Sequence, residues 1–424
     1  MDDARLEVNE KAGQEAFALR RQRMQDVIDL KEPDRVPYYL SWRFWAARQA
    51  GMTCEDAMYD PKALSAASRP WLRELQPDAY QLPHLQIAIG PPLETLDFKA
   101  IQWPGHGVDE NVSYQYLDEE FITAAEYDDY LSDATGFFLR KYLPRIAKGI
   151  EGFQNLPDIP GFYYTGLMGL GRFFNDPGVR QALDTISKVG RQVDSIMEEA
   201  MEFSGGMEAE GFPLFSMGVT GAPFDQISDY MRGSKGAMLD MFRHKDKLLA
   251  TLDQATKYNI GNVKALAKVK PGGHVFMPLH WGLGGFMSPD QFDTYYWPQL
   301  RRVIMATIDE GLVPYVFWEG NCEERLETIA DIPPGKVIYK FEQTDLVKAK
   351  SVLSGVACVQ GNVPASLLNT GTPEDVEEYC KNLIRDVGKG GGFILDGGAG
   401  VPDEAQVENV MAMANAARTH GQYG

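Results

Sequence analysis

A carboxyl group stands near the expected end of a strand, in the segment 317–322 (Phe-Trp-Glu-Gly-Asn-Cys). Glu319 lies there between Trp318 and a Gly-Asn turn. Burial beside an indole ring raises the pKa of a carboxyl group and lets it act as an acid near neutral pH. Alternatively, the carboxylate only accepts hydrogen bonds from backbone N–H groups of the next loop. The sequence leaves both interpretations open.

His280 is a second candidate, because Trp281 and a glycine-rich turn at 282–285 follow it. An imidazole can donate a proton or bind a ligand near neutral pH, or it can be a cavity-wall histidine with satisfied hydrogen bonds. The open, polar turn favours the functional role. Asp396 follows the glycines 390–392, which allow either a close approach to a ligand or a tight strand-to-helix bend.

Other familiar chemistry finds no support in the sequence. Neither glycine-rich stretch matches a dinucleotide fingerprint or a phosphate-binding loop, and no Ser-His-Asp motif is evident. The four cysteines are too scattered for a disulfide framework and form no metal-binding pair; they are Cys54, Cys322, Cys358 and Cys380.

These side chains must be positioned by a fold. Short apolar runs that alternate with helical stretches predict its strands and helices. The expected strands are 78–85, 161–167, 213–219, 274–281, 312–319, 336–342, 356–361 and 392–397. Eight strands alternating with helices predict an α/β fold with a single closed (β/α)₈ TIM-type barrel. We expect the barrel at 78–424, after a helical N-terminal arm and entry segment at 1–77 that includes the extended residues 36–40. At the strand ends, His84 and Asn362 join the candidate substrate-binding residues.

An insertion at about 94–160 interrupts the alternation. Residues 108–136 hold nine acids and no Lys or Arg. We favour a solvated excursion that caps one end of the barrel, and a docking surface for a partner protein is the alternative.

Composition excludes several classes of function. The chain has 424 residues, and its 41 Lys and Arg against 60 Asp and Glu give a net charge of −19. This charge argues against binding nucleic acid or anionic membranes. The acidic start lacks the features of a signal peptide, and no run is long and apolar enough for a membrane span. We therefore expect a cytoplasmic protein.

Several motifs together resemble the uroporphyrinogen decarboxylase-like family. They are 20–37 (RRQRMQDVIDLKEPDRVP), 286–289 (FMSP), 296–298 (YWP), 319–321 (EGN), 361–364 (GNVP), 371–374 (GTPE), 392–394 (GFI) and 408–410 (ENV). The resemblance covers most of the chain. It implies a single (β/α)₈ barrel, in agreement with the strand count. It also implies one of two chemistries, namely decarboxylation of uroporphyrinogen or methyl transfer between a small molecule and a corrinoid protein.

Departures from the family pattern favour methyl transfer. The arginine-rich segment with which the decarboxylases bind substrate carboxylates is reduced here to Ala47-Arg48-Gln49-Ala50-Gly51-Met52, followed by acids. The zinc ligands of the thiol methyltransferases correspond to Phe317, Glu319 and Ala399, so zinc is not supported by the usual ligands. A different zinc set with His280 and Glu319 stays an open alternative.

The resemblance thus implies a methyltransferase that passes a methyl group from a methoxylated aromatic or similar donor to cobalamin on a partner corrinoid protein. Its expected acid is Glu319 or His280. The expected aromatic walls are Trp318, Trp281, Tyr39 and Phe317. Decarboxylation and non-catalytic corrinoid binding remain alternatives, and the chain could form a homodimer.

Overall fold

Eight strands make up the main parallel β-structure of the computed structural model, which describes residues 2–158 and 161–423. Six of them form one continuous sheet, and the first two form a pair. The strands are β1 (Tyr39–Leu40), β2 (Ala79–Tyr80), β6 (Ser216–Val219), β7 (His274–Leu279), β8 (Val313–Trp318), β9 (Ile338–Phe341), β10 (Cys358–Val363) and β11 (Phe393–Gly397).

Two junctions close these strands into a barrel. On one side Tyr38 bridges Leu395, and the Leu395 N–H donates to the carbonyl of Pro37 at 2.9 Å. On the other side Tyr80 bridges Leu214, and the Phe215 N–H donates to the Tyr80 carbonyl at 3.0 Å. Both bridges are parallel, as in the rest of the ring. The predicted α/β barrel fold is therefore confirmed.

One predicted strand is wrong. Residues 161–167 do not enter the barrel, because helix α10 (Tyr164–Phe174) begins within them. Short apolar runs look alike in strands and helices, and this run is not buried, since Phe162 is fully exposed. The eighth strand is β1, which lies in the extended entry segment 36–40 that precedes the predicted start of the barrel. The other seven predicted strands overlap observed ones.

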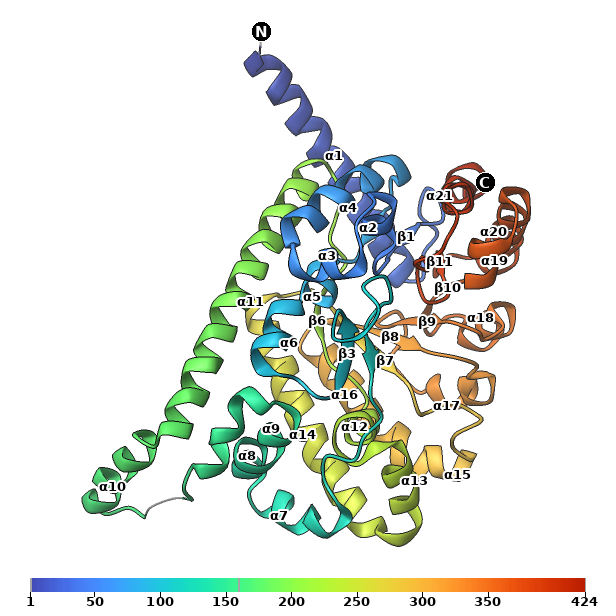
Figure 1. The fold of residues 1–424 in the computed structure, drawn as a ribbon. Coiled ribbons are helices and arrows are strands. Elements are labelled where there is room, and N and C mark those ends of the chain that lie inside the picture. Colours follow the sequence, from blue (N-terminus) through green and yellow to red (C-terminus); the bar gives the residue numbers. More distant parts are fainter. Residues whose placement is uncertain (1, 159–160, 424) are drawn as a thin grey trace.

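Helices cover the outside of the barrel, and the long helix α11 runs along one side of the molecule (Figure 1). Ser288 and Thr372 cap helix N-termini with their hydroxyl groups, and a proline follows each of them at the first helical position. The helices of this layer are α1 (Asp2–Ile28), α2 (Trp45–Gln49), α3 (Cys54–Tyr59), α4 (Pro61–Leu75), α11 (Pro177–Ala209), α12 (Pro223–Ile227), α13 (Gly233–Arg243), α14 (Lys245–Val269), α15 (Pro289–Gln291), α16 (Trp297–Asp309), α17 (Leu326–Ile329), α18 (Leu346–Leu353), α19 (Ala365–Thr370), α20 (Pro373–Val387) and α21 (Val407–His420).

Single turns of other helix types complete this layer: η4 (Ser228–Arg232), η5 (Phe292–Tyr296) and η6 (Glu323–Arg325). Across the described ranges, no helix is both long and apolar enough to cross a bilayer.

A long excursion separates β2 from β6 and carries its own small three-stranded sheet. It contains α5 (His84–Ile87), α6 (Gly90–Leu96), β3 (Ile101–Pro104), β4 (Gly107–Val108), β5 (Gln115–Tyr116), η1 (Ala124–Glu126), α7 (Tyr127–Ser132), α8 (Ala134–Phe137), η2 (Phe138–Tyr142), α9 (Leu143–Ile146) and η3 (Lys148–Asn155).

Five of the nine acids in 108–136 form ion pairs with residues outside this stretch. Ion pairs join Glu120 to Arg232, Glu126 to Arg145, Asp128 to Lys247, Asp129 to Lys141 and Asp133 to Arg140. Two of these basic residues lie on η4 and α14, so the ion pairs attach the excursion to the barrel helices. A count of charges within 108–136 misses this pairing.

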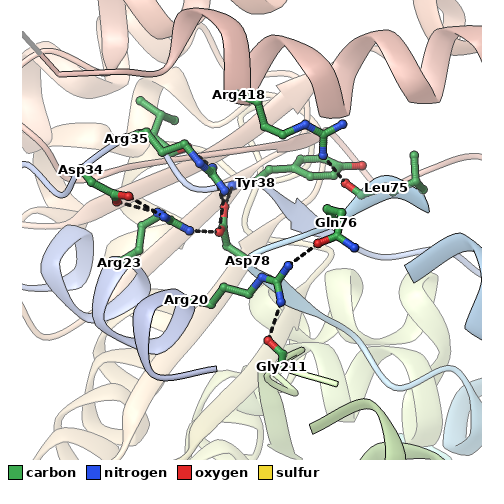
Figure 2. Close-up of polar contacts among 11 residues, drawn as sticks. Arg20, Arg23, Asp34, Arg35, Tyr38, Leu75, Gln76, Asp78, Gly211 and Arg418 are labelled. Carbon is green, nitrogen blue, oxygen red and sulfur yellow. Dashed lines mark hydrogen bonds and ion pairs between the residues drawn. The ribbon is translucent and has the colours of Figure 1, made fainter. Parts of the chain in front are cut away.

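Helix α1 is tied to the amino-terminal ends of the first strands by a buried ion network (Figure 2). Asp78 is fully buried and pairs with Arg23 and Arg35, and it also accepts the Tyr38 N–H at 2.8 Å. Arg23 binds Asp34 as well. In (β/α)₈ barrels this end of the strands serves stability, and the opposite end carries the active site.

Candidate functional site

The carboxyl ends of the strands open into a cavity of about 570 Å³. Aromatic rings from strands, loops and the excursion form much of its wall: Trp42, Tyr114, Tyr116, Tyr230, Phe276, Trp281, Tyr315 and Phe317. A second hollow of about 530 Å³ is lined by residues of α20 and α21 and by no strand-end residue. The strand-end cavity is therefore the candidate active site.

His280 directly follows β7, and its imidazole lies between two carboxylates. Its Nδ1 is 2.6 Å from Oδ2 of Asp229, and its Nε2 is 3.6 Å from Oε1 of Glu319. Burial opposes a charge on the ring, but the hydrogen bond to Asp229 and the nearby Glu319 and Asp225 carboxyl groups outweigh it and raise the pKa of His280 to about 11. The ring is therefore an imidazolium at neutral pH, with both nitrogens donating.

One helical segment, α12 followed by η4, holds this histidine in place. Asp225 and Asp229 are four residues apart on it and project towards the same strand end. Asp225 accepts the His280 N–H at 2.8 Å, the Trp281 N–H at 3.2 Å and the Tyr296 O–H at 2.7 Å. Burial raises the pKa of Asp225 to about 7, against the lowering effect of His280. Asp229 also accepts the indole N–H of Trp281.

Glu319 follows β8 and faces the cavity, with its side chain 40% exposed. Gly320 turns the chain away with a φ of +71°, and a Cβ there would meet Leu283 at 2.7 Å. The loop N–H groups donate to other acceptors: Gly320 to Glu342 at 2.7 Å, Cys322 to Thr344 at 3.0 Å and Glu323 to Asn321 at 2.9 Å. The Glu319 carboxylate therefore does not accept these backbone hydrogen bonds. Among the described residues it forms an ion pair with His280.

A second charged pair lies deeper in the barrel. Lys340 of β9 lines the cavity, and its Nζ lies 2.6 Å from Oδ2 of Asp396 on β11. Gln360 on β10 donates to the same Asp396 oxygen at 2.8 Å and to the Tyr315 hydroxyl at 3.0 Å. Because Asp396 is not among the cavity-lining residues, only the cationic side of this pair faces the cavity.

The structure brings four of the predicted site residues together in the cavity wall: His280, Trp281, Phe317 and Glu319. Trp318 is not there, because neighbouring residues of a strand point to opposite sides, and it packs against Phe292 and Tyr339 outside the barrel. The prediction of Trp318 as a wall is thus wrong.

Four further predicted residues are also outside the wall. Tyr39 packs against Phe215 in the barrel interior. His84 starts the short helix α5 and is hydrogen-bonded to Ser65 at 2.7 Å. The Asn362 amide donates to the Thr344 carbonyl at 2.8 Å, and Asp396 binds Lys340.

Sequence reasoning missed Asp225, Asp229 and Lys340. The two aspartates carry a readable signal, because acids four residues apart at a helix start after a strand reach one strand end. Lys340 is a lone charge in the apolar strand Ile-Tyr-Lys-Phe. A charge in a buried strand is kept only where it has a partner or a ligand.

The donor set does not fit zinc. Phe317, Glu319 and Ala399 all line the cavity at the positions of the family's zinc ligands, but phenyl and methyl groups cannot coordinate a metal. Within residues 2–158 and 161–423, no three His, Cys, Asp or Glu side chains are arranged to hold a metal ion.

Comparisons with known proteins agree with this fold. Residues 208–420 match the family model described as uroporphyrinogen decarboxylase (URO-D). Uroporphyrinogen decarboxylase from Coxiella burnetii (strain Dugway 5J108-111) is 26% identical over 42% of this chain and 48% of its own length, so the chain spans about half of that relative. The Pseudoalteromonas translucida (strain TAC 125) enzyme of the same name is 23% identical over 71% of this chain and 89% of its own.

A solved structure resembles the whole barrel. The methyltransferase from Methanosarcina mazei superposes with a TM-score of 0.60 at 17% identity, covering 93% of this chain and 97% of the other. At this identity the likeness extends to the fold. The chemistry must be argued from the cavity.

Proposed function

We propose that this chain, which belongs to the uroporphyrinogen decarboxylase family, is a methyltransferase that removes the methyl group of an aromatic methyl ether. The acceptor is the reduced cobalt of a corrinoid carried by a partner protein, which supplies the nucleophile. The observation that carries the proposal is the His280 imidazole, held between the Asp229 and Glu319 carboxylates in an aromatic-walled cavity.

The proposed step needs a proton at the ether oxygen. A phenolate, whose pKa is about 10 in water, leaves poorly when the methyl carbon is attacked. As the C–O bond breaks, its electron pair stays on oxygen, His280 gives that oxygen its proton, and the methyl group goes to the nucleophile. General acids of this kind accelerate reactions by about 10²–10⁴-fold.

The surrounding residues prepare this transfer. Asp229 orients the imidazole through Nδ1, which leaves Nε2 to face the cavity beside Glu319. Glu319 is half-exposed, so it can return a proton from solvent to His280 after each turnover. The rings of Trp281 and Phe317 supply flat apolar faces for an arene.

The charge of the cavity supports this proposal over decarboxylation of uroporphyrinogen. Its cationic lining residues are Arg43, Lys340 and the His280 imidazolium, and Lys340 is neutralised by Asp396. Asp118, Asp229 and Glu319 also line it. A substrate with eight carboxylates would meet more negative than positive charge.

Anaerobic incubation with reduced cobalamin and a panel of methoxyarenes tests the proposal, with methylcobalamin followed by its absorption spectrum. His280→Ala should lower the rate by at least 100-fold, and Glu319→Gln should lower it less. Glu323→Gln is the matched control, because Glu323 on η6 pairs with exposed Lys348 on α18. If His280→Ala and Glu319→Gln both keep the unmodified rate, the proposal is wrong. Cobalamin binding without turnover of any donor would favour a non-catalytic corrinoid-binding protein.

A further inference from the structure

Lys340 lies about one layer of side chains below Glu319, the carboxylate beside the proposed acid His280. In the sheet register, Lys340 on β9 is opposite Phe317 on β8, and Glu319 is two residues further along the same strand. Two residues of a strand span about 6.6 Å. Both Lys340 and Glu319 line the cavity, so its polar groups occur at two depths with the Phe317 ring at the lower one.

The Lys340 ammonium is buried and has unused donors. The residue is 3% exposed. Of the three N–H groups of an ammonium, one is accounted for by Asp396, the hydrogen-bond acceptor found for Nζ among the described residues. The Phe317 and Tyr39 rings lie beside it, with centroids 5.1 and 5.7 Å from Nζ. The other N–H groups have no protein acceptor among the described residues, so an oxygen of a ligand in the cavity can accept from one of them.

We propose that Lys340 is a substrate-binding residue that donates a hydrogen bond to a second oxygen substituent on the arene, across the ring from the methyl ether at His280. This inference rests on the proposed function and specifies its substrate class as dioxygenated arenes. In this arrangement the arene lies beside the Phe317 ring, between His280 and Lys340, which both line the cavity.

The charge balance selects a neutral oxygen. Asp396 is 1% exposed and already matches the charge of Lys340. A carboxylate substituent would add a charge that the paired Lys340 does not balance, in a cavity whose other charged lining residues are the anionic Asp118, Asp229 and Glu319 and the cationic Arg43 and His280. A hydroxyl or ether oxygen accepts from the ammonium without this repulsion.

Equilibrium binding of shape-matched probes, measured by calorimetry without corrinoid, tests the inference. The probes are 1,4-dimethoxybenzene and 1-ethyl-4-methoxybenzene, which differ by an oxygen in place of a methylene. The unmodified protein should bind the dimethoxy probe about tenfold more tightly, as expected for a hydrogen bond to a charged donor. Equal affinities would overturn the role of Lys340. A tighter binding of 4-methoxybenzoate than of 1,4-dimethoxybenzene would overturn the choice of a neutral oxygen.

Variants separate recognition from a merely structural ion pair. Lys340→Met alone leaves the buried Asp396 carboxylate without its ion-pair partner, so the double variant Lys340→Met/Asp396→Asn removes both charges. In the double variant the ratio of the two affinities should fall to about one while the ethyl probe binds as before, and Glu323→Gln should keep the ratio of the unmodified protein. A tenfold preference that survives in the double variant overturns the inference.

The outcomes also distinguish this inference from the proposed function. A Lys340-dependent preference without methyl transfer would reject the proposed reaction and keep the binding role. Methyl transfer without the preference would keep the proposed reaction and reject the binding role of Lys340. If the unmodified protein binds neither probe, the aromatic substrate class fails, and the role of Lys340 fails with it.

Discussion

Replacing Asp229 by Asn removes one of the charges that keep His280 protonated, while the amide oxygen can still accept from Nδ1. The pKa of His280 is raised from about 6.5 to about 11, and the contact to Asp229 at 2.6 Å is shorter than the one to Glu319 at 3.6 Å. Asp229 should therefore carry the largest single share of the stabilisation of the imidazolium.

The size of that share follows from Coulomb's law. The His280 side chain is 34% exposed, so an effective dielectric constant of about 40, between those of water and a protein surface, is appropriate. Over 2.6 Å this gives about 3 kcal/mol, or about 2 pKa units. The pKa of His280 in the variant should then be about 9.

This shift has a consequence for stability. A histidine whose pKa is raised by folding contributes stability that is complete below pH 6.5 and is lost as the pH rises through the folded-state value. In the unmodified protein this loss extends from about pH 6.5 to about pH 11. In Asp229→Asn this loss of stability should already be complete near pH 9.

Carbon-13 NMR of labelled histidine measures the pKa directly, since the chain has six histidines and His280→Gln assigns the resonance. Asp118→Asn is the matched control, because Asp118 lines the same cavity but binds Ser234, and it should leave the His280 titration unchanged. A titration midpoint still near 11 in Asp229→Asn would show that Asp229 contributes nothing. A midpoint near 6.5 in the unmodified protein would refute the imidazolium altogether.

Three further predictions concern the scaffold, each measured by urea unfolding. Asp78→Asn should lower the free energy of unfolding by about 3–5 kcal/mol, because it leaves two arginines without their buried partner; a loss under 1 kcal/mol would contradict this. Gly390→Ala should lower the free energy of unfolding by about 1–2 kcal/mol, because the backbone there is left-handed. Gly391→Ala should lower it clearly more, because the new Cβ would also lie 2.2 Å from the Lys31 carbonyl oxygen. Equal losses in the two variants would refute this clash. Trp318→Ala should cost about 3–5 kcal/mol yet spare aryl ether binding, and weakened binding by the folded variant would contradict its outward position.

The fold was largely predictable because parallel strands that are buried on both faces consist mostly of apolar residues, and such runs can be recognised in the sequence. That signal locates β7 and β8 well, yet it fails at 161–167, where an equally apolar run is exposed and leads into α10. It also passes over β1, which the bridge to Leu395 reveals. Pairing between distant segments is a property of the ring and is absent from any short window of sequence.

The site was predictable only in part, for a different reason. Glu319 and His280 stand at strand ends beside aromatic residues and turns, which is a local pattern. The residue that sets the charge of His280 is Asp229, from a helix 51 positions earlier in the chain. The alternation of side chains along a strand is enough to predict that Trp318 points to the side opposite Phe317 and Glu319. That Lys340 faces the cavity follows only from the tertiary structure.

The junction between Tyr38 and Leu395 also dictates an order of events during synthesis. The first strand emerges early from the ribosome, but its neighbour β11 is among the last segments made. Until then the nascent sheet keeps two open edges, the situation in which unpaired strands find wrong partners. The closing contact joins opposite ends of the chain and so carries a large loop-closure entropy, which slows folding. A chain released before β11 would be an incomplete ring with an apolar interior open to solvent, and such a product is a natural target for chaperones.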